Sequence, residues 1–280
     1  MSGPTNALPP EDYAEPRCLL SGERFGAPSP VQSIPQRRIA DRLDDYMSRR
    51  DYAGAERHLL YWMQEAELGR DLRGQLFLCG ELVGHYRKTG ARENAFRYAE
   101  RALALLDTLG FEGTVTAGTT LVNAATAYSA FGEHERALAL FGQARAAYES
   151  APELPRHLLG GLYNNMATAC KALGRFSEAY DLYDRAMDAM GQVAGGVLEQ
   201  AITCLNIADA VAAEQGLEAG EARIAALLDR AYALLHDDSA PRDGYYAFVC
   251  EKCAPCFSYY GYFAAAAELQ QAAEAIYERS

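Results

Sequence analysis

The chain of 280 residues is half apolar and acidic overall, with 38 acidic and 26 basic side chains and a formal net charge of −12. This balance predicts no nucleic-acid partner, because nucleic acid and anionic lipid both attract basic surfaces. No membrane partner is expected either, since no apolar run approaches the ~18 residues of a membrane-spanning helix, and the first residues lack the pattern of a secretory signal. Seven cysteines, an odd number in a chain of this length, indicate free thiols and a cytoplasmic protein.

Residues 1–35 differ in composition from the rest of the chain. Seven of the eleven prolines lie at or before Pro35. Proline fixes φ and has no amide donor, so packed helices are disfavoured there. We predict an extended or disordered N-terminal arm over 1–35, followed by a single helical domain over 36–280.

A unit of about 42 residues repeats through this helical region. Its markers are the alanines Ala102, Ala144, Ala186, Ala231 and Ala273 and the turn glycines Gly90, Gly132 and Gly174. The spacing is 42 residues except between Ala186 and Ala231, where it is 45. A fixed period of this length is typical of a supersecondary unit stacked on copies of itself.

Helical periodicity divides the region into six predicted helix pairs. In chain order they are 36–50 with 53–69, 72–89 with 92–109, 115–131 with 134–150, 156–173 with 176–191, 197–214 with 221–236, and 243–260 with 263–279. No segment alternates as a strand would. We expect the turn of the fifth pair, residues 215–220, to be longer than the others, which would account for the wider alanine spacing.

Each pair carries a recurring motif of large and small residues. In the third pair it reads Leu121-x2-Ala124-Ala125-x2-Tyr128 in the first helix and Ala137-x3-Phe141-x2-Ala144 in the second. This pattern resembles the tetratricopeptide repeat, and the length of about 42 residues resembles the repeats of kinesin light chains and of many bacterial tetratricopeptide proteins. The resemblance covers about residues 36–280. It implies an all-α fold, a right-handed α-solenoid (superhelix) of about six such pairs.

The resemblance also implies where a ligand would bind, because the first helix of each pair lines a concave groove in this family. The residues just before the packing triplet form a row, Glu81, Asn123, Asn165, Asn206 and Lys252, flanked by Arg87, Thr126, Asn164, Thr168, Lys171 and Asp209. An asparagine amide can both donate to and accept from an extended backbone, which suits a peptide-binding groove. The alternative is structural: the asparagines could bond one another across the stack.

The sharpest sign of other chemistry is Cys250-x2-Cys253-x2-Cys256, whose spacing could serve a metal. A fourth cysteine and a downstream histidine pair are missing, and Cys250 and Cys253 fall on packing positions of the repeat. We therefore predict cysteines packed in the core, with no metal and no cofactor. Pro255 within this motif is expected to kink its helix.

No catalytic motif is found. Gly113-x4-Gly118 lacks the lysine of a phosphate-binding loop, and the histidines are scattered. The sequence favours a non-catalytic scaffold that binds a protein or peptide segment in its groove. A peptide-sensing regulatory solenoid acting on a protein partner is the alternative, and a metal-binding or enzymatic protein is a minor one.

Dense aromatic residues in the last pair suggest a homo-oligomer formed through the C-terminal repeat.

Overall fold

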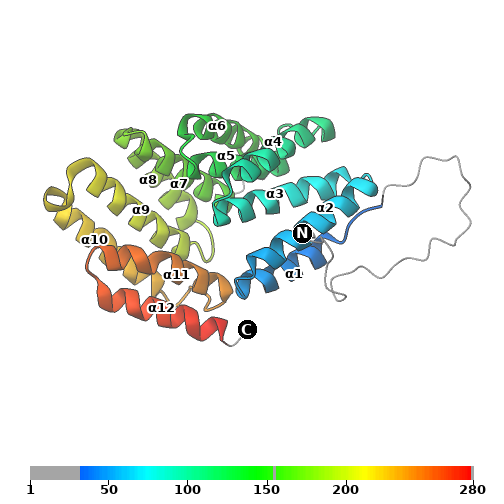
Figure 1. The fold of residues 1–280 in the computed structure, drawn as a ribbon. Helices are drawn as coiled ribbons and strands as arrows, with labels where there is room; N and C mark the ends of the chain where they lie inside the picture. The colour runs from blue at the N-terminus through cyan, green and yellow to red at the C-terminus, as the bar shows by residue number, and fades with distance from the viewer. Residues whose placement is uncertain (1–31, 154–155, 279–280) are drawn as a thin grey trace, which may run out of the picture. The chain divides into compact units, whose positions relative to one another are not determined.

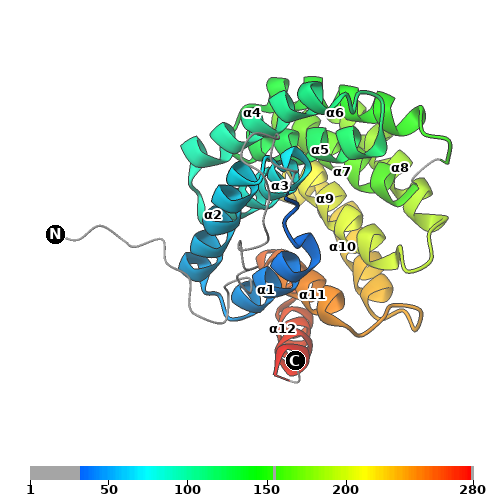
Figure 2. The same cartoon turned by 90° about the vertical axis from the view of Figure 1, so that its right-hand side faces the viewer.

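The computed structural model describes residues 32–153 and 156–278, and these residues are helical with no strand among them (Figures 1 and 2). Most of the predicted N-terminal arm lies outside the described residues. The helices are α1 (Gln36–Ser48), α2 (Tyr52–Leu68), α3 (Leu72–Thr89), α4 (Arg92–Leu109), α5 (Val115–Ala130), α6 (His134–Glu149), α7 (Arg156–Ala172), α8 (Phe176–Gly191), α9 (Val197–Gln215), α10 (Leu217–Leu235), α11 (Gly244–Tyr259) and α12 (Phe263–Tyr277). They form six consecutive pairs, which confirms the predicted fold class. None of the described helices is long and apolar enough to cross a bilayer.

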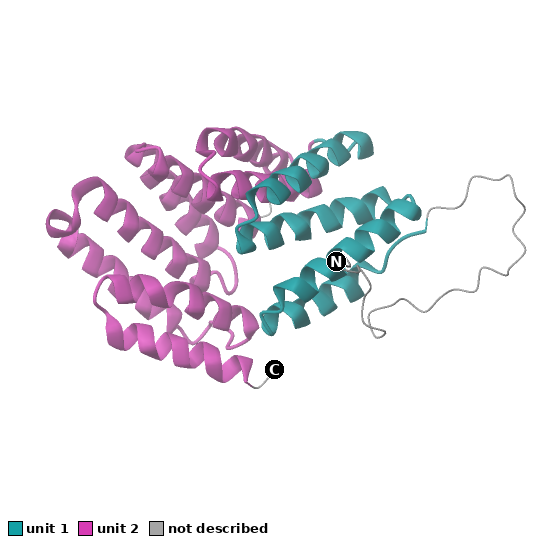
Figure 3. Ribbon diagram, viewed as in Figure 1, with its two compact units in different colours: residues 1–112 teal, residues 113–280 magenta. Residues whose placement is uncertain are grey.

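The chain divides into two compact units, residues 1–112 and 113–280 (Figure 3). Unit 1 contains the pairs α1–α2 and α3–α4, and α2 also packs on α3. In its core the rings of Tyr86 and Tyr98 stack 5.7 Å apart. The segment before α1 is fastened to the α2–α3 turn: the amide of Ile34 donates to Asp71 Oδ2 over 2.9 Å, and the amide of Gln32 donates to the Gly69 carbonyl over 3.0 Å.

Unit 2 contains four pairs arranged in two layers. The first helices, α5, α7, α9 and α11, contact one another in that order, and we call them the first-helix layer. The second helices, α6, α8, α10 and α12, each pack on their partner, and α6 and α8 also pack on the first helix of the next pair. A continuous apolar core runs through the last three pairs, from Ala167 to Ala273.

Small residues allow these helices to approach closely. The five alanines that mark the repeat are all buried, with at most 3% of their surface exposed. Gly118 on α5 is an extreme case, because a Cβ there would lie 2.4 Å from Cε1 of Tyr148 on α6. The repeat is therefore visible in the sequence because each pair needs a small residue at the same contact.

The backbone conformation explains why glycine recurs at the turns within the pairs. Gly90, Gly132 and Gly174 have φ between +73° and +87°, a region that favours glycine. Gly216 and Gly261 serve the last two pairs in the same way, with φ of +82° and +85°.

The prediction of a long turn in the fifth pair is wrong. α9 ends at Gln215 and α10 begins at Leu217, so Gly216 alone separates the two helices. The extra residues lengthen both helices to 19 residues, because Leu217, Glu218 and Ala219 are good helix formers. Gly220 is buried inside α10, where a Cβ would come within 2.8 Å of Val211 on α9.

Candidate functional site

The predicted site residues divide between the two units. Glu81 and Arg87 lie on α3 in unit 1, and the other nine lie on the first-helix layer of unit 2. Glu81 is half-buried; burial raises the pKa of its carboxyl group, and the charge of Asp44 on α1 raises it further. Arg87 is exposed in the last turn of α3, where a cation interacts favourably with the helix dipole.

The asparagines of the predicted row differ in their surroundings. Asn123 on α5 is exposed, whereas Asn165 on α7 and Asn206 on α9 are half-buried. Asn206 Nδ2 donates to Asn164 Oδ1 over 3.0 Å, which joins α9 to α7. Asn164 is only 9% exposed, so its buried side chain holds the Asn206 amide in position through this bond. The structural alternative therefore describes this one pair, while Asn123 and Asn165 keep amide groups accessible.

The two threonines of the site bond their own helices. Thr126 Oγ1 donates to the Val122 carbonyl over 2.7 Å, and Thr168 Oγ1 donates to the Asn164 carbonyl over 3.0 Å. Threonine in a helix commonly satisfies its hydroxyl in this way. Thr168 Oγ1 also lies 3.4 Å from the Tyr183 hydroxyl, whereas the Thr126 oxygen retains the capacity to accept a bond from a ligand.

Lys171 and Asp209 form one cluster of charged groups in the layer. Lys171 Nζ on α7 lies 4.0 Å from Asp209 Oδ2 on α9. Asp209 Oδ1 also accepts from the hydroxyl of Tyr260 over 2.9 Å and contacts Cys256 Sγ at 3.8 Å. Asp209 thus ties three successive pairs together.

A second cluster joins α9 to α11. The hydroxyl of Tyr245 donates to Glu199. Burial raises the pKa of Glu199, and the charge of Lys252 opposes that rise. Both lysines of the layer thus lie near a carboxylate, so this surface is polar with little net charge.

Sequence reasoning missed Glu199, Tyr245, Cys256 and Tyr260 as members of these clusters. Glu199 had a usable signal, because it lies seven residues before Asn206 and so on nearly the same face of α9. In the sequence, Tyr245 and Tyr260 are recognisable only as two of the dense aromatic residues of the last pair. Their bonds cross 46 to 51 residues of sequence, and the repeat pattern carries no trace of such pairs.

Cys250 and Cys253 of the last pair are packed as predicted, whereas Cys256 is only half-buried. Cys250 and Cys253 are at most 1% exposed, and burial raises the pKa of Cys253 to about 12. Burial also raises the pKa of the half-buried Cys256 to about 12, with the Asp209 carboxylate contributing. Within the described ranges, no three His, Cys, Asp or Glu side chains gather in a way that could hold a metal. α11 continues through Pro255 for another turn.

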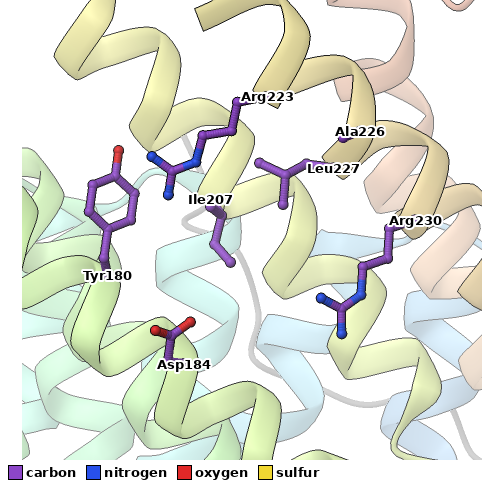
Figure 4. A pocket seen from close by; sticks show the side chains of 7 residues that line it. All are labelled: Tyr180, Asp184, Ile207, Arg223, Ala226, Leu227 and Arg230. Atoms are coloured by element: carbon purple, nitrogen blue, oxygen red, sulfur yellow. The ribbon is translucent and has the colours of Figure 1, made fainter.

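A cavity of about 350 Å³ that the sequence did not predict lies between α8 and α10, beside α9 (Figure 4). It is open to solvent, and Asp184, Arg223, Ala226 and Arg230 of its lining are exposed. Its lining consists of Tyr180, Asp184, Ile207, Arg223, Ala226, Leu227 and Arg230. The Arg223 guanidinium lies over the Tyr180 ring, 4.5 Å from its centroid. The Tyr180 hydroxyl donates to Glu214 Oε2 over 2.8 Å, which fixes the position of the ring.

Comparison with known families identifies part of the helical region. A family model described as tetratricopeptide repeat matches residues 77–150, which span most of α3 and all of α4, α5 and α6. This part of the chain therefore matches the tetratricopeptide repeat. Proteins built from these repeats are generally non-catalytic scaffolds for protein–protein interaction.

Three solved structures are similar to this chain. A putative kinesin light chain of P. anserina with nearly identical tetratricopeptide-like repeats has a TM-score of 0.48 and 20% identity, over 73% of this chain and 94% of that one. BtubC (BKLC) from P. vanneervenii has a TM-score of 0.48 and 16% identity, over 87% and 91% of the two chains. A Rap protein complexed with competence and sporulation factor has a TM-score of 0.49 and 14% identity, over 87% and 75%. No curated protein matches the sequence.

Proposed function

We propose that the chain is a non-catalytic scaffold and that the first-helix layer of unit 2 binds an extended segment of a protein or peptide. The observation that carries this proposal is the row of amide side chains on adjacent helices: Asn123 on α5, Asn165 on α7 and Asn206 on α9. An extended backbone crossing the layer would meet one amide at each helix. Each amide offers both a donor and an acceptor, as each peptide unit does.

The charges of the layer support recognition of a main chain. Lys171 lies beside Asp209, and Lys252 is close enough to Glu199 to affect its pKa. With its charges largely compensated, the surface would discriminate little among acidic and basic side chains of the ligand. Hydrogen bonds to the ligand backbone would then supply most of the affinity for an extended segment, with little selection for its sequence.

The test compares wild-type protein with a variant carrying Asn123→Ala and Asn165→Ala. Asn206 is left in place because it bonds Asn164, so its loss would mix binding with stability. Partners captured from the native cell lysate by the wild-type chain are identified, and their affinities for both proteins are then measured. Each lost hydrogen bond is worth about 0.5–1.5 kcal/mol, so affinity should fall roughly fivefold or more.

The matched control replaces two exposed amides of the second helices, Gln143 on α6 and Gln270 on α12, by alanine. This variant should bind as the wild type does. Full affinity in the asparagine variant, or an equal loss in the glutamine variant, would refute the proposed binding surface.

The six described cysteines are free thiols, and we place this scaffold in a reducing compartment, the cytoplasm.

The last pair supports a second part of the proposal, self-association. Of the nine large apolar side chains most exposed in the described residues, five lie on α11 and α12: Tyr245, Phe248, Tyr259, Phe263 and Tyr277. Phe248 is 46% exposed, whereas Ile202, at the equivalent position of α9, is 4% exposed. Tyr277 is likewise exposed where its equivalent Leu235 is buried. Positions that the preceding pair buries are thus open here.

Light scattering during gel filtration tests this part. Phe248→Ser combined with Tyr259→Ser should reduce the measured mass of an oligomer to that of a monomer. Leu217→Ser, at an exposed apolar residue on α10, is the control and should leave the mass unchanged. A monomeric wild-type protein at ~100 µM would exclude an oligomer of useful strength.

A further inference from the structure

We propose that the cavity between α8 and α10 is a second binding site, which takes a carboxylate group attached to an apolar body. Of the first-helix layer it uses only Ile207 on α9, which is not one of the residues proposed above to bind a segment, so the two proposals can be tested independently. The ligand would be a carboxylate at the end of a polypeptide or a free small carboxylic acid. Both present the same chemistry to the cavity.

Two guanidinium groups face this cavity from one side. Arg223 and Arg230 are two turns apart on α10, so they lie on the same face about 10 Å from each other along the axis. Figure 4 shows both side chains directed toward α8 across the floor formed by Ile207 and Leu227. The Tyr180 ring holds the Arg223 guanidinium in place by a cation–π contact at 4.5 Å.

Acidic side chains bridge the other neighbouring second helices of unit 2. Glu268 on α12 accepts from the Tyr232 hydroxyl of α10 over 2.6 Å and pairs with His236 at 3.1 Å. Glu135 on α6 pairs with Arg175, just before α8, at 2.6 Å. Each of these bridges places an acid opposite a donor on the adjacent helix.

Such a bridge is missing between α8 and α10. Asp184 lines the cavity from α8, but among the described residues neither Arg223 nor Arg230 has a carboxylate oxygen within the 4.0 Å of an ion pair. Neither guanidinium of the cavity is therefore ion-paired with a carboxylate of the described residues, Asp184 included. Arginine matches a carboxylate geometrically, with two parallel N–H donors for its two oxygens.

The lining also limits which anion fits. The lining carries two arginines and one aspartate, and the Glu214 carboxylate is bonded to the Tyr180 hydroxyl beside Arg223. These two acids disfavour a phosphate dianion more than a monoanion. Ile207, Ala226 and Leu227 provide an apolar floor for methylene or methyl groups. A volume of about 350 Å³ is near the lower limit for small-molecule sites, enough for one small acid or one terminal residue.

The arginine pair is peculiar to this repeat. Aligning the helices on Ala186, Ala231 and Ala273 places Glu178 and Arg185 of α8, and Ala265 and Ala272 of α12, at the positions of Arg223 and Arg230. The pair is therefore not part of the packing pattern that all repeats share. Arg185 is exposed and lies outside the cavity, which makes it a matched control for Arg230.

The test follows the arginine side-chain Nε–Hε signals of the full chain by NMR during titration with four probes. These are N-acetyl-leucine, which mimics a chain terminus, 4-methylpentanoate, which is a free acid, N-acetyl-leucinamide, which lacks the carboxylate, and inorganic phosphate. We expect at least one of the two carboxylates to shift the signals of Arg223 and Arg230 in a saturable manner, with a Kd in the millimolar range, and the amide to cause no shift. Tighter binding of N-acetyl-leucine would identify a polypeptide terminus as the source, and equal or tighter binding of 4-methylpentanoate a free acid.

The variants decide whether the cavity is responsible. Arg230→Gln should weaken carboxylate binding about tenfold or more, and Arg185→Gln should leave it unchanged. Unaltered thermal unfolding of both variants would show that their folds are intact. The proposal is overturned if neither carboxylate gives saturable shifts, if the amide or phosphate binds as tightly as the acids, or if Arg185→Gln weakens binding as much as Arg230→Gln.

Discussion

Asn206 on α9 donates a hydrogen bond to the buried amide oxygen of Asn164 on α7, over 3.0 Å. The two residues are 42 positions apart, and the bond joins the first helices of consecutive pairs. Asn164 and Asn206 therefore bond each other across adjacent helices, whereas Asn123 and Asn165 take no part in this bond.

This division predicts different effects on stability. Asn206→Ala should lower the free energy of unfolding by about 1–3 kcal/mol, because it leaves the buried Asn164 oxygen without its donor. Asn123→Ala, at an exposed position, should change it by no more than about 0.5 kcal/mol. Urea unfolding followed by circular dichroism measures both. Equal effects of the two substitutions would show that the Asn164–Asn206 bond contributes nothing specific.

Gly118→Ala should destabilise the chain by about 1–3 kcal/mol. The added Cβ would lie 2.4 Å from the Tyr148 ring, which is 1% exposed and whose hydroxyl is bonded to Thr119 at 3.0 Å. Gly142→Ala is the control, since a Cβ at that helical position meets nothing within 4 Å. It should stabilise α6 by up to about 1 kcal/mol, so thermal melts of the two variants should move in opposite directions.

The fold could be predicted from the sequence because its strongest constraints recur. Ala144 and Ala186 are buried at the same helix contact, and Gly132 and Gly174 adopt the same positive φ. Because each pair needs a small residue at this contact and a glycine at this turn, both residue types recur at a fixed spacing in the sequence. The turn of the fifth pair was mispredicted because Gly216 and Gly220 both resemble turn residues, and only the packing of Gly220 on Val211 shows that it belongs inside a helix.

The candidate site could be predicted only in part, for a related reason. The row Asn123, Asn165 and Asn206 follows the repeat, so the sequence alone suggests it. The partners of Asp209 and Glu199 come from α11 at irregular separations, and the sequence gives no rule for pairing them. Arg223 and Arg230 have the spacing of any exposed helix face. The sequence therefore does not reveal the cavity that they line, because its other walls come from α8 and α9.

The half-buried Glu81 should make stability depend on pH. Burial and the nearby Asp44 raise the pKa of its carboxyl group in the folded chain above the ordinary 4.5. Its favourable contribution is therefore present below the unfolded pKa and is lost as the pH rises through the folded pKa. Glu81→Gln removes this titration. The variant should gain stability relative to the wild type as the pH rises from about 4 to 7.

Urea unfolding of the wild type and Glu81→Gln at several pH values gives the difference directly. Glu274→Gln, at an exposed site on α12, is the control and should show no comparable trend. A difference for Glu81→Gln that stays constant from pH 4 to 7 would mean that its carboxyl group titrates alike in the folded and unfolded chains.

Asp71 and Asp51 allow a matched comparison of two helix caps. Asp51 caps α2 by accepting from the Gly54 amide over 2.8 Å and is exposed. Asp71 caps α3 through Gly74 over 2.9 Å, is 4% exposed, and accepts a second bond from the amide of Ile34 over 2.9 Å. Losing an N-cap costs about 1 kcal/mol, and an unpaired buried amide costs about 1–3 kcal/mol more.

Asp51→Ala should therefore lower the free energy of unfolding by about 1 kcal/mol and Asp71→Ala by at least twice as much. Hydrogen exchange adds a readout that a cap alone would not affect. Only Asp71→Ala should speed exchange at the Ile34 amide, because that amide loses its acceptor. If the two variants lose the same stability and Ile34 stays protected, Asp71 does not anchor the segment that leads into α1.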